Sequence, residues 1–459
     1  MKKRILLIGY NFHPEPTGIG KYNGEMISWF VKQGYDCTVI TSYPYYPFWK
    51  VQEPYYKNRL WYSTEESSDV ETNGKLKIFR CPQYVPVQPS GFKRVLLDLS
   101  FIISAFFPLL KLLTSKKFDF VITVAPAFQI GLLGLLYKKI RKAKLLYHIQ
   151  DLQIEAARDL KMIKSKWIIN TLFKVEQFIF KRSDIISSIS KGMVDKIEKK
   201  ANKNVLLFPN WTDTTVFYPI EDKAQLRKDF GFNPSDKIIL YSGSIGEKQG
   251  IDSILHVANE LRDLKDLKFV ICGSGPYKQN LQSIAEQLGL RNVNFFPIQP
   301  HSKFNEFLNL ADVHLVIQKA GASDLVMPSK ITTILSVGGL AVITANKGSD
   351  LHTLFNDHNM GVLVEAENTT ALKECIVSLI NKDSTEINKN ARKYAENSLS
   401  IDKIMLSFER LMQHQNTTLS SKKAPVLFTP VDANSSDSKV SISALEIPVV
   451  PKAQKSRNG

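Results

Sequence analysis

The stretch IILYSGSIGEKQG, residues Ile238–Gly250, carries the pattern on which the fold prediction rests. A short run of apolar residues, Ile238–Ser242, is followed at once by a glycine-rich turn and then by a helix-like segment. A run that is apolar throughout, without alternation, is typical of a central strand in a parallel sheet covered on both faces. The stretch therefore predicts a strand, a tight turn and a helix, which together begin a βαβ unit.

The same pattern recurs along most of the chain. Twelve short apolar runs bounded by turn residues are candidate strands: Ile5–Gly9, Cys37–Thr41, Phe120–Val124, Leu145–Ile149, Ile185–Ser188, Val205–Phe208, Ile238–Ser242, Lys268–Cys272, Val293–Phe296, Val313–Ile317, Ala341–Thr344 and Gly361–Val364. A break rich in turn formers, residues 209–236, separates the first six from the last six. We predict an α/β protein with two doubly wound, Rossmann-like parallel-sheet domains that face a cleft.

The predicted domains are residues 1–215 and 216–400, followed by a helix over 401–415. Residues 416–459 are rich in Ser, Thr, Pro and Lys without periodicity, which predicts a disordered tail. Residues 43–84 are crowded with proline and aromatic residues and are expected to form a long loop over the first domain.

Composition excludes several classes of protein. The chain has 459 residues, of which 44% are hydrophobic and 23% are charged, as in globular proteins of two or three domains. These values argue against a collagen, a coiled coil, a disordered chain or a polytopic membrane protein. The four cysteines show no regular spacing, so neither a disulfide scaffold nor a zinc site is indicated, and a reducing cytosol fits best.

The charge of the chain is concentrated in one region. The net charge is +16, and between Gly91 and Lys200 there are 21 Lys and Arg against 9 Asp and Glu. Such a surface suits a polyanion, either nucleic acid or an anionic membrane, and no nucleic-acid-binding module is visible. The apolar segment Val95–Leu113 lies here, but its uncharged part is shorter than the roughly 20 residues of a membrane span. We expect residues 92–144 to contact the membrane surface, the alternative being a core helix with solvated charges at its end.

Two glycine-rich turns follow predicted strands and could bind phosphate, because each aims backbone N–H groups at a ligand. The first contains Gly18 and Gly20, and the second contains Ser244, Gly246 and Lys248. Lys248 could neutralise a phosphate, although both turns could equally be structural and the lysine solvated.

Two further strand ends carry candidate groups. Gly273 lies in a turn that is better explained by local structure than by a ligand. After the other strand, Val313–Ile317, a loop with Asp324 leads to a helix that begins at Ser329 and Lys330. The N-terminus of this helix and Lys330 would together bind a diphosphate. A solvated lysine at a helix end is the alternative.

In the first domain, Asp151 follows the run Leu145–Ile149. A carboxylate at that edge of a parallel sheet could bind a hydroxyl or accept a proton. It could equally cap the next helix.

The order of these motifs resembles the GT-B glycosyltransferases of family 4, the retaining, metal-independent class. The resemblance covers roughly residues 1–415 and rests on PTGIGKYNGEM, VEQFIFKRSDIISSISKGM, LFPNWTDTTVFYP, YSGSIGEKQGID, FVICGSGPYKQNL and VMPSKITTILSVGGLAVIT. In detail, the sequence resembles those of the colanic-acid biosynthesis enzymes of this family, which are assigned as fucosyltransferases.

The resemblance implies roles for several residues. Gly18 and Gly20 would pack against the donor diphosphate or the acceptor, and Ser244–Lys248 would hold the diphosphate with help from Lys330. The family's two signature glutamates align with Leu325 and Thr333, so that Asp324 would replace the first and only a hydroxyl remains at the second. No metal or other cofactor is implied, and no pair of carboxylates in a DxD motif stands out.

The resemblance thus implies a glycosyltransferase that moves a sugar from a nucleotide diphosphate to a lipid-linked saccharide with retention of configuration. The sugar would be fucose, the donor GDP-fucose, and the pathway exopolysaccharide (colanic acid) biosynthesis. The enzyme would be cytoplasmic and peripheral at the inner face of the plasma membrane, with no nucleic-acid partner. Two alternatives remain: an isomerase like the nucleotide-sugar 2-epimerases, which share the architecture, and a catalytically silent subunit of a polysaccharide assembly complex.

Overall fold

The computed structural model describes residues 3–159, 163, 165–320 and 328–414. The predicted tail, residues 416–459, lies outside them. The chain forms two compact units. Unit 1 comprises the described residues up to Ser187 together with Lys200–Leu206, and unit 2 comprises Ser188–Lys199 and the described residues from Leu207 onward.

Unit 1 is built on a sheet in the order β3-β4-β2-β1-β5-β6-β7-β8. Its strands are β1 (Arg4–Ile8), β2 (Asp36–Ser42), β3 (Ser63–Ser68), β4 (Lys75–Cys81), β5 (Phe120–Ala125), β6 (Lys144–Ile149), β7 (Ile185–Ser188) and β8 (Leu206–Leu207). From β4 to β6 neighbouring strands are parallel, and β3 is an antiparallel edge strand on β4. The helical segments of unit 1 are α1 (Gly18–Lys32), η1 (Tyr56–Asn58), α2 (Gly91–Leu113), α3 (Ile130–Arg141), α4 (Gln153–Asp159) and α5 (Lys166–Arg182). Helix α6 (Lys191–Ala201), between β7 and β8 in the sequence, belongs mostly to unit 2.

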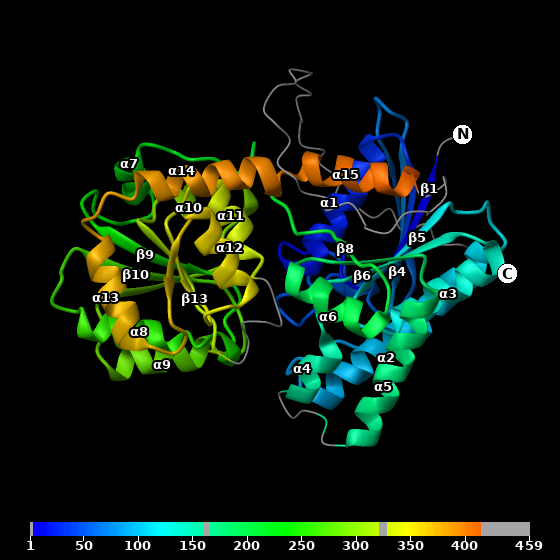
Figure 1. The fold of residues 1–459 in the computed structure, drawn as a ribbon, viewed down its shortest axis with the longest axis horizontal. Helices are drawn as coiled ribbons and strands as arrows, with labels where there is room; N and C mark the ends of the chain where they lie inside the picture. Colours follow the sequence, from blue (N-terminus) through cyan, green and yellow to red (C-terminus); the bar gives the residue numbers. More distant parts are fainter. Residues whose placement is uncertain (1–2, 160–162, 164, 321–327, 415–459) are drawn as a thin grey trace. The chain divides into compact units, whose positions relative to one another are not determined.

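Unit 2 has an all-parallel sheet in the order β11-β10-β9-β12-β13-β14. Its strands are β9 (Lys237–Ser242), β10 (Leu267–Cys272), β11 (Val293–Phe296), β12 (Val313–Val316), β13 (Ala341–Thr344) and β14 (Val362–Val364). Its helical segments are α7 (Lys223–Asp229), η2 (Glu247–Gln249), α8 (Asp252–Glu260), α9 (Lys278–Gln287), α10 (His301–Asn309), α11 (Lys330–Ser336), α12 (Asp350–His358), α13 (Thr369–Leu379), α14 (Thr385–Tyr394), η4 (Ala395–Leu399) and α15 (Ile401–His414). Helices α8, α9 and α13 cover one face, and α10, α11 and α12 cover the other (Figure 1).

All twelve predicted strands are confirmed, and so is the division into two parallel α/β sheets. The prediction of one long loop over residues 43–84 was wrong, because β3 and β4 lie within it. The sequence of β3, STEESS, carries no apolar residue, and its burial alternates between half-buried and exposed positions. A polar edge strand of this kind gives no signal to a search for apolar runs.

Helix α2 has the length and hydropathy of a membrane span, being 23 residues long, and no other described helix does. Its inner face belongs to the hydrophobic core of unit 1 through Leu97, Phe101, Ala105 and Leu109, which are nearly inaccessible to solvent. This burial shows that α2 packs on unit 1, as in the alternative of a core helix, while contact of its outer face with a membrane stays a prediction.

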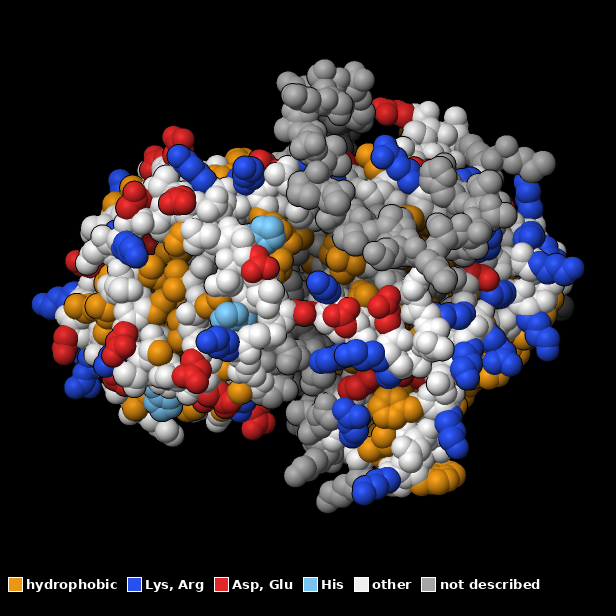
Figure 2. Space-filling view, in the orientation of Figure 1, with side chains coloured by type: hydrophobic (Ala, Val, Ile, Leu, Met, Phe, Trp, Pro, Cys, Tyr) orange, Lys and Arg blue, Asp and Glu red, His pale blue; other side chains and the backbone are white. Residues whose placement is uncertain are grey.

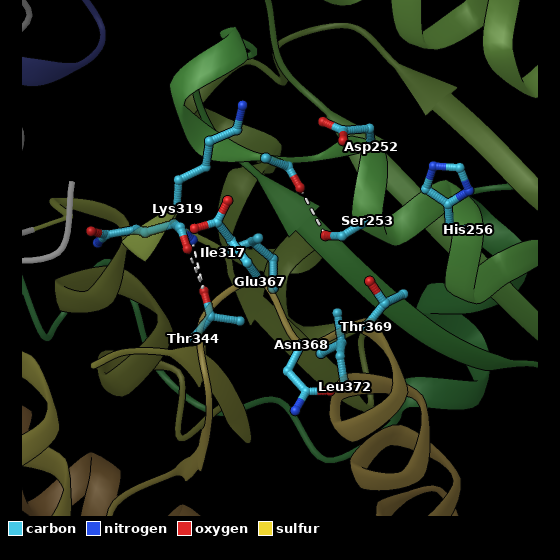
Figure 3. Close-up of a pocket in the computed structure, with 12 residues that line it drawn as sticks. Asp252, Ser253, His256, Ile317, Lys319, Thr344, Glu367, Asn368, Thr369 and Leu372 are labelled. Carbon is cyan, nitrogen blue, oxygen red and sulfur yellow. Dashed lines mark hydrogen bonds between the residues drawn. The ribbon is translucent and has the colours of Figure 1, made fainter. Parts of the chain in front are cut away.

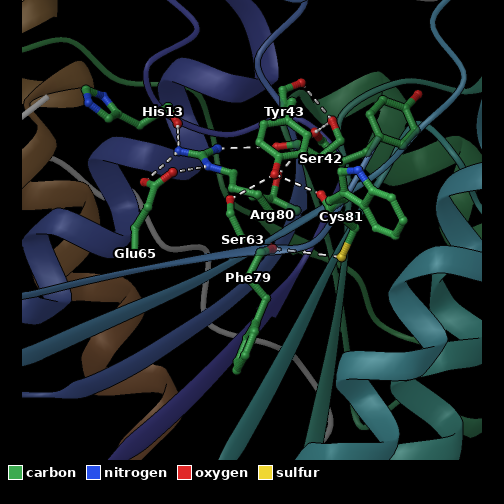
Figure 4. A network of polar contacts seen from close by, with 11 residues as sticks. His13, Ser42, Tyr43, Ser63, Glu65, Phe79, Arg80 and Cys81 are labelled. Carbon is green, nitrogen blue, oxygen red and sulfur yellow. Dashed lines mark hydrogen bonds and ion pairs between the residues drawn. The ribbon is translucent and has the colours of Figure 1, made fainter. Parts of the chain in front are cut away.

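Arg80 ties the first strands of unit 1 together from a fully buried position (Figure 4). Its Nε and Nη2 atoms donate to the two carboxylate oxygens of Glu65 on β3, at 2.9 and 3.2 Å. The same guanidinium donates to the carbonyl oxygens of Ser42, at the end of β2, and His13, in the loop after β1. One cation thus links two strands and the loop that leads to α1.

We expect Glu65→Ala to destabilise unit 1 by about 3 kcal/mol, because it leaves the buried Arg80 charge without its carboxylate. The matched control is Glu66→Ala on the same strand, whose partner Lys77 is exposed. That change should cost less than about 1 kcal/mol. Denaturant unfolding measures both, and equal losses would contradict this view of Arg80.

Candidate active site

The loops after β9 and β10 pack closely against each other in unit 2. The backbone N–H of Gly243 donates to the carbonyl oxygen of Cys272, and that of Ile245 donates to Ser274. A Cβ atom at Gly273, whose φ is +150°, would lie 1.9 Å from the carbonyl oxygen of Gly243. Gly273 is therefore required for loop packing, whatever contact it makes with a ligand.

Lys330, the first residue of α11, points at this pair of loops. Its Nζ atom is buried and has no hydrogen-bond partner among the described residues, and it lies 3.6 Å from the centre of the Tyr241 ring. A Cβ atom on Gly243 would come within 2.9 Å of Nζ, so the glycine makes room for the ammonium. Burial lowers the pKa of Lys330 to about 7.

A buried cation beside an aromatic ring gains some cation–π stabilisation, but this does not replace a counter-ion. Lysine almost never becomes fully buried without an acidic partner. The ammonium lies at the edge of the sheet where the parallel strands end, which is where ligands bind in open α/β sheets. An anion bound at this edge would supply the missing partner.

The other residues predicted for this site are placed as follows. Ser329 is exposed and precedes α11 without capping it. Thr333 is buried, and its hydroxyl donates to the carbonyl oxygen of Lys330 at 3.0 Å, so it is occupied within the helix. Ser244 is exposed and its carbonyl oxygen accepts from the Tyr241 hydroxyl, while Gly246 immediately precedes η2.

Two predicted catalytic residues cannot be placed. Asp324 lies outside the described residues, and so does the side chain of Lys248, although its backbone belongs to η2. Lys330 is therefore the predicted cation whose position the structure provides.

In unit 1, Gly18 and Gly20 lie at the start of α1 beside an acidic residue that the sequence reasoning missed. Glu15 is buried and accepts hydrogen bonds from Asn11 and from the backbone N–H groups of Tyr45 and Tyr46. A Cβ atom on Gly20 would meet the Glu15 carboxylate at 2.3 Å. Burial raises the pKa of Glu15 to about 7. Its place in the sequence, between two prolines and seven residues after the first strand, does not by itself indicate a buried acid.

Asp151 follows β6 and is half-buried. Burial raises the pKa of Tyr10, and the negative charges of Asp98 and Asp151 raise it further, so both carboxylates lie close to that phenol. Tyr10 itself comes two residues after β1. Asp151 therefore lies at the carboxyl edge of the sheet, as predicted, and its role there remains a prediction.

A cavity of about 200 Å³ opens at the carboxyl ends of β12 and β13 (Figure 3). Asp252 and His256 of α8 line one side of it, and Lys319 and Glu367 line the other. Within the described ranges, no three His, Cys, Asp or Glu side chains come together in the arrangement of a metal site.

Comparison with known proteins finds glycosyltransferase families and a glycosyltransferase relative. The family described as "Glycosyl transferases group 1" matches residues 222–398, and the "Glycosyl transferase 4-like domain" matches residues 17–211. A protein of Escherichia coli K12 named as a colanic acid biosynthesis glycosyl transferase, WcaI, is 40% identical over 415 residues, covering 88% of this chain and 98% of that protein.

Solved structures show the same fold. A sucrose-phosphate synthase from Thermosynechococcus elongatus superposes with a TM-score of 0.69 at 15% identity, covering 90% of this chain and 99% of that one. Anabaena HepE, crystallised with UDP and glucose, gives a TM-score of 0.63 at 13% identity, with coverage of 90% and 99%. The predicted pair of Rossmann-like domains of the GT-B type is thereby confirmed.

The stability of the ligand-free protein should depend on pH through Lys330. The pKa of Lys330 is about 7 in the folded protein and near 10.5 in the unfolded chain, so the unfolded state binds more protons between these values. Stability contributed by this residue should rise as pH increases through this window. Lys330→Met, which removes the buried charge, should be more stable than the wild type by a few kcal/mol near pH 7.

That advantage should shrink as the pH approaches 10, as measured by thermal unfolding without nucleotide. Lys382→Met, at an exposed lysine of unit 2, provides the control and should change little at any pH. An advantage of Lys330→Met that is constant with pH would contradict the account.

Proposed function

Because the chain belongs to the group 1 glycosyltransferases, we propose that it transfers fucose from GDP-fucose to a lipid-linked saccharide during the synthesis of an exopolysaccharide such as colanic acid. The observation that carries the proposal is the buried ammonium of Lys330, which has no hydrogen-bond partner in the part of the chain that the structure describes and lies where parallel strands end. A nucleotide diphosphate is the anion that such an enzyme would bind at this edge of the unit 2 sheet. The choice of pathway is supported by the 40% identity with WcaI across nearly its whole length.

Lys330 would act on the leaving group. As the bond between the anomeric carbon and the diphosphate oxygen breaks, its electrons pass to the diphosphate, and the adjacent ammonium stabilises the new negative charge. The low pKa of the free lysine would rise as the anion binds, because an opposite charge favours the protonated form. This arrangement supplies positive charge from the protein and supports a metal-independent reaction.

The acceptor hydroxyl would attack the anomeric carbon from the face that the diphosphate leaves, so that configuration is retained. The hydroxyl proton would pass to an oxygen of the departing diphosphate, which balances the reaction without a separate base. Asp151, at the carboxyl edge of the unit 1 sheet, would orient the acceptor hydroxyl.

The outer face of α2 supports a location at a membrane surface. Its large apolar side chains that remain exposed repeat at helical spacing: Phe92, Val95, Leu96, Leu99, Ile103, Phe106, Phe107 and Leu110. Leu60, Trp61 and Tyr62 are also exposed, and Tyr62 donates a hydrogen bond to the carbonyl oxygen of Ser104 in α2. We call these eleven residues the apolar face.

Exposed lysines lie near both ends of α2, at Lys93, Lys111, Lys116 and Lys117. Lys and Arg side chains are also numerous over the part of unit 1 that carries α3 (Figure 2). Apolar side chains bordered by cations are what an anionic bilayer surface attracts. A lipid-linked acceptor would be found there.

The donor is identified by thermal-shift measurements with GDP, UDP, dTDP and their common sugars. A ligand that binds the folded protein raises its melting temperature, and we expect GDP and GDP-fucose to do so. Lys330→Met should remove most of this shift. If UDP-sugars alone stabilise the protein, the fucose assignment is wrong. If no nucleotide binds, a catalytically silent subunit becomes the better description, and conversion of a nucleotide sugar without any acceptor would favour the isomerase.

Membrane attachment is measured by sedimentation with vesicles of phosphatidylglycerol and phosphatidylcholine in equal parts. Ile103→Glu and Phe107→Glu should each weaken binding about tenfold or more, because each removes an exposed apolar side chain whose transfer into the bilayer would be worth about 2 kcal/mol. Val377→Glu, at an exposed apolar position of unit 2, is the control and should bind as the wild type does. Equal binding by all variants would show that the apolar face does not enter the bilayer.

A further inference from the structure

Asp98 is the one acidic residue in the 23-residue sequence of α2, and its side chain is buried, with 3% of the residue exposed. A carboxyl group in such a position is unfavourable unless its oxygens are satisfied. The stabilisation of the leaving group by Lys330 does not involve Asp98, and neither does the apolar face on the outside of α2.

The two oxygens of Asp98 differ in their surroundings. Oδ2 accepts a hydrogen bond from Gln153 Nε2 at 3.1 Å, and the Tyr10 hydroxyl also bonds to the carboxyl. Oδ1 is buried and has no partner among the described residues. Burial raises the pKa of Asp98 to about 7, although the hydrogen bonds from Gln153 and Tyr10 and the charge of Arg94 act to lower it.

Arg94 lies one helical turn before Asp98 and presents a complementary group. Its Nε atom is buried and has no acceptor within the described part of the chain. Its guanidinium lies 5.4 Å from the centre of the Trp49 ring. Arg94 and Trp49 are half-buried, whereas Asp98 is buried.

The backbone of Trp49 is unusual. Its φ is +54°, a left-handed conformation that a bulky residue rarely adopts. Its ring packs against Tyr45 and Tyr46, with centroids 5.7 and 6.4 Å away, which helps to hold the conformation. Strain of this kind is concentrated at ligand-binding positions.

We propose that Asp98, Arg94 and Trp49 form a binding subsite for a neutral sugar ring of the acceptor. The unpartnered carboxyl oxygen would accept a sugar hydroxyl, the unpartnered Nε–H would donate to a sugar oxygen, and the indole would cover the apolar face of the ring. Pockets of this kind combine aromatic surface with a few polar groups that set orientation. A carboxylate in place of the hydroxymethyl group of the ring could not donate to the Asp98 oxygen, because an ionised carboxylate only accepts hydrogen bonds.

The position of the subsite agrees with this role. Tyr10, just after β1, and Gln153, four residues after β6, bring Asp98 to the carboxyl edge of the unit 1 sheet, where ligands bind. Asp151 also lies near Tyr10, so the sugar ring would be held next to the residue proposed to orient its hydroxyl. The subsite rests on the proposed function in that it assigns the ring to the acceptor.

The test is sugar binding by the full chain in solution, measured by saturation-transfer NMR with methyl β-D-galactoside and, as its anionic counterpart, methyl β-D-galacturonide. The wild type should bind the neutral glycoside better. Asp98→Leu and Arg94→Met should each weaken that binding about tenfold, the loss of one hydrogen bond to a charged group. Asp98→Asn, which keeps one oxygen acceptor, should fall between.

Arg59→Met is the matched control, because Arg59 stacks on Tyr56 in the same aromatic segment and its ring contact, at 3.6 Å, is closer than that of Arg94. It should bind the glycoside as the wild type does. Failure of the wild type to bind the neutral glycoside would overturn the subsite. Equal binding by Asp98→Leu, Arg94→Met and Arg59→Met would also overturn it, and would leave Asp98 and Arg94 with a structural role only.

GDP-dependent thermal stabilisation is measured on the same variants and reports on unit 2 independently. If GDP stabilises the wild type while no glycoside binds, the subsite fails and the proposed donor site stands. If the glycoside binds as expected but no nucleotide does, the sugar subsite stands and the proposed transfer fails.

Discussion

A buried lysine ammonium, with no hydrogen-bond partner within the described ranges, is the constraint around which the carboxyl edge of unit 2 is arranged. Lys330 begins a helix at that edge, Tyr241 lies under its Nζ atom, and Gly243 leaves the space that the ammonium needs. Gly273 then follows as a requirement, since the loop that bears Gly243 packs directly on it. The free protein carries the cost of an unpaired cation, and an anionic ligand removes that cost.

The buried charged side chains of the described residues are of two kinds, those whose hydrogen bonds are satisfied and those whose hydrogen bonds are not. In unit 1, Arg80 is fully enclosed, but its Nε and Nη2 atoms donate to a carboxylate and its Nη1 and Nη2 atoms donate to backbone carbonyl oxygens, so it stabilises the strands it joins. Lys330 in unit 2 has no such neighbours among the residues that the structure describes. A satisfied buried charge indicates a structural role, and an unsatisfied one indicates a place for a ligand. The same criterion singles out Asp98 and Arg94.

Much of this could be predicted from sequence. Central parallel strands are short and apolar, so all twelve were found, and the motif at Lys330 was recognised because a strand, a loop and a helix start follow one another. The edge strand β3 was missed because it is entirely polar. Glu15 and Asp98 were missed because nothing in a sequence tells a buried acid from an exposed one, and the occupied hydroxyl of Thr333 depends on helix geometry.

The central claim is that Lys330 receives the diphosphate of the donor, and NMR of lysine-labelled protein tests it most directly. The Nζ resonance of Lys330, assigned by its loss in Lys330→Met, is titrated with pH in the absence and presence of GDP. The account predicts a pKa near 7 in the free protein and a pKa well above it, toward the ordinary lysine range, once GDP is bound. A pKa that GDP leaves unchanged, at nucleotide concentrations that saturate the protein, would contradict the claim.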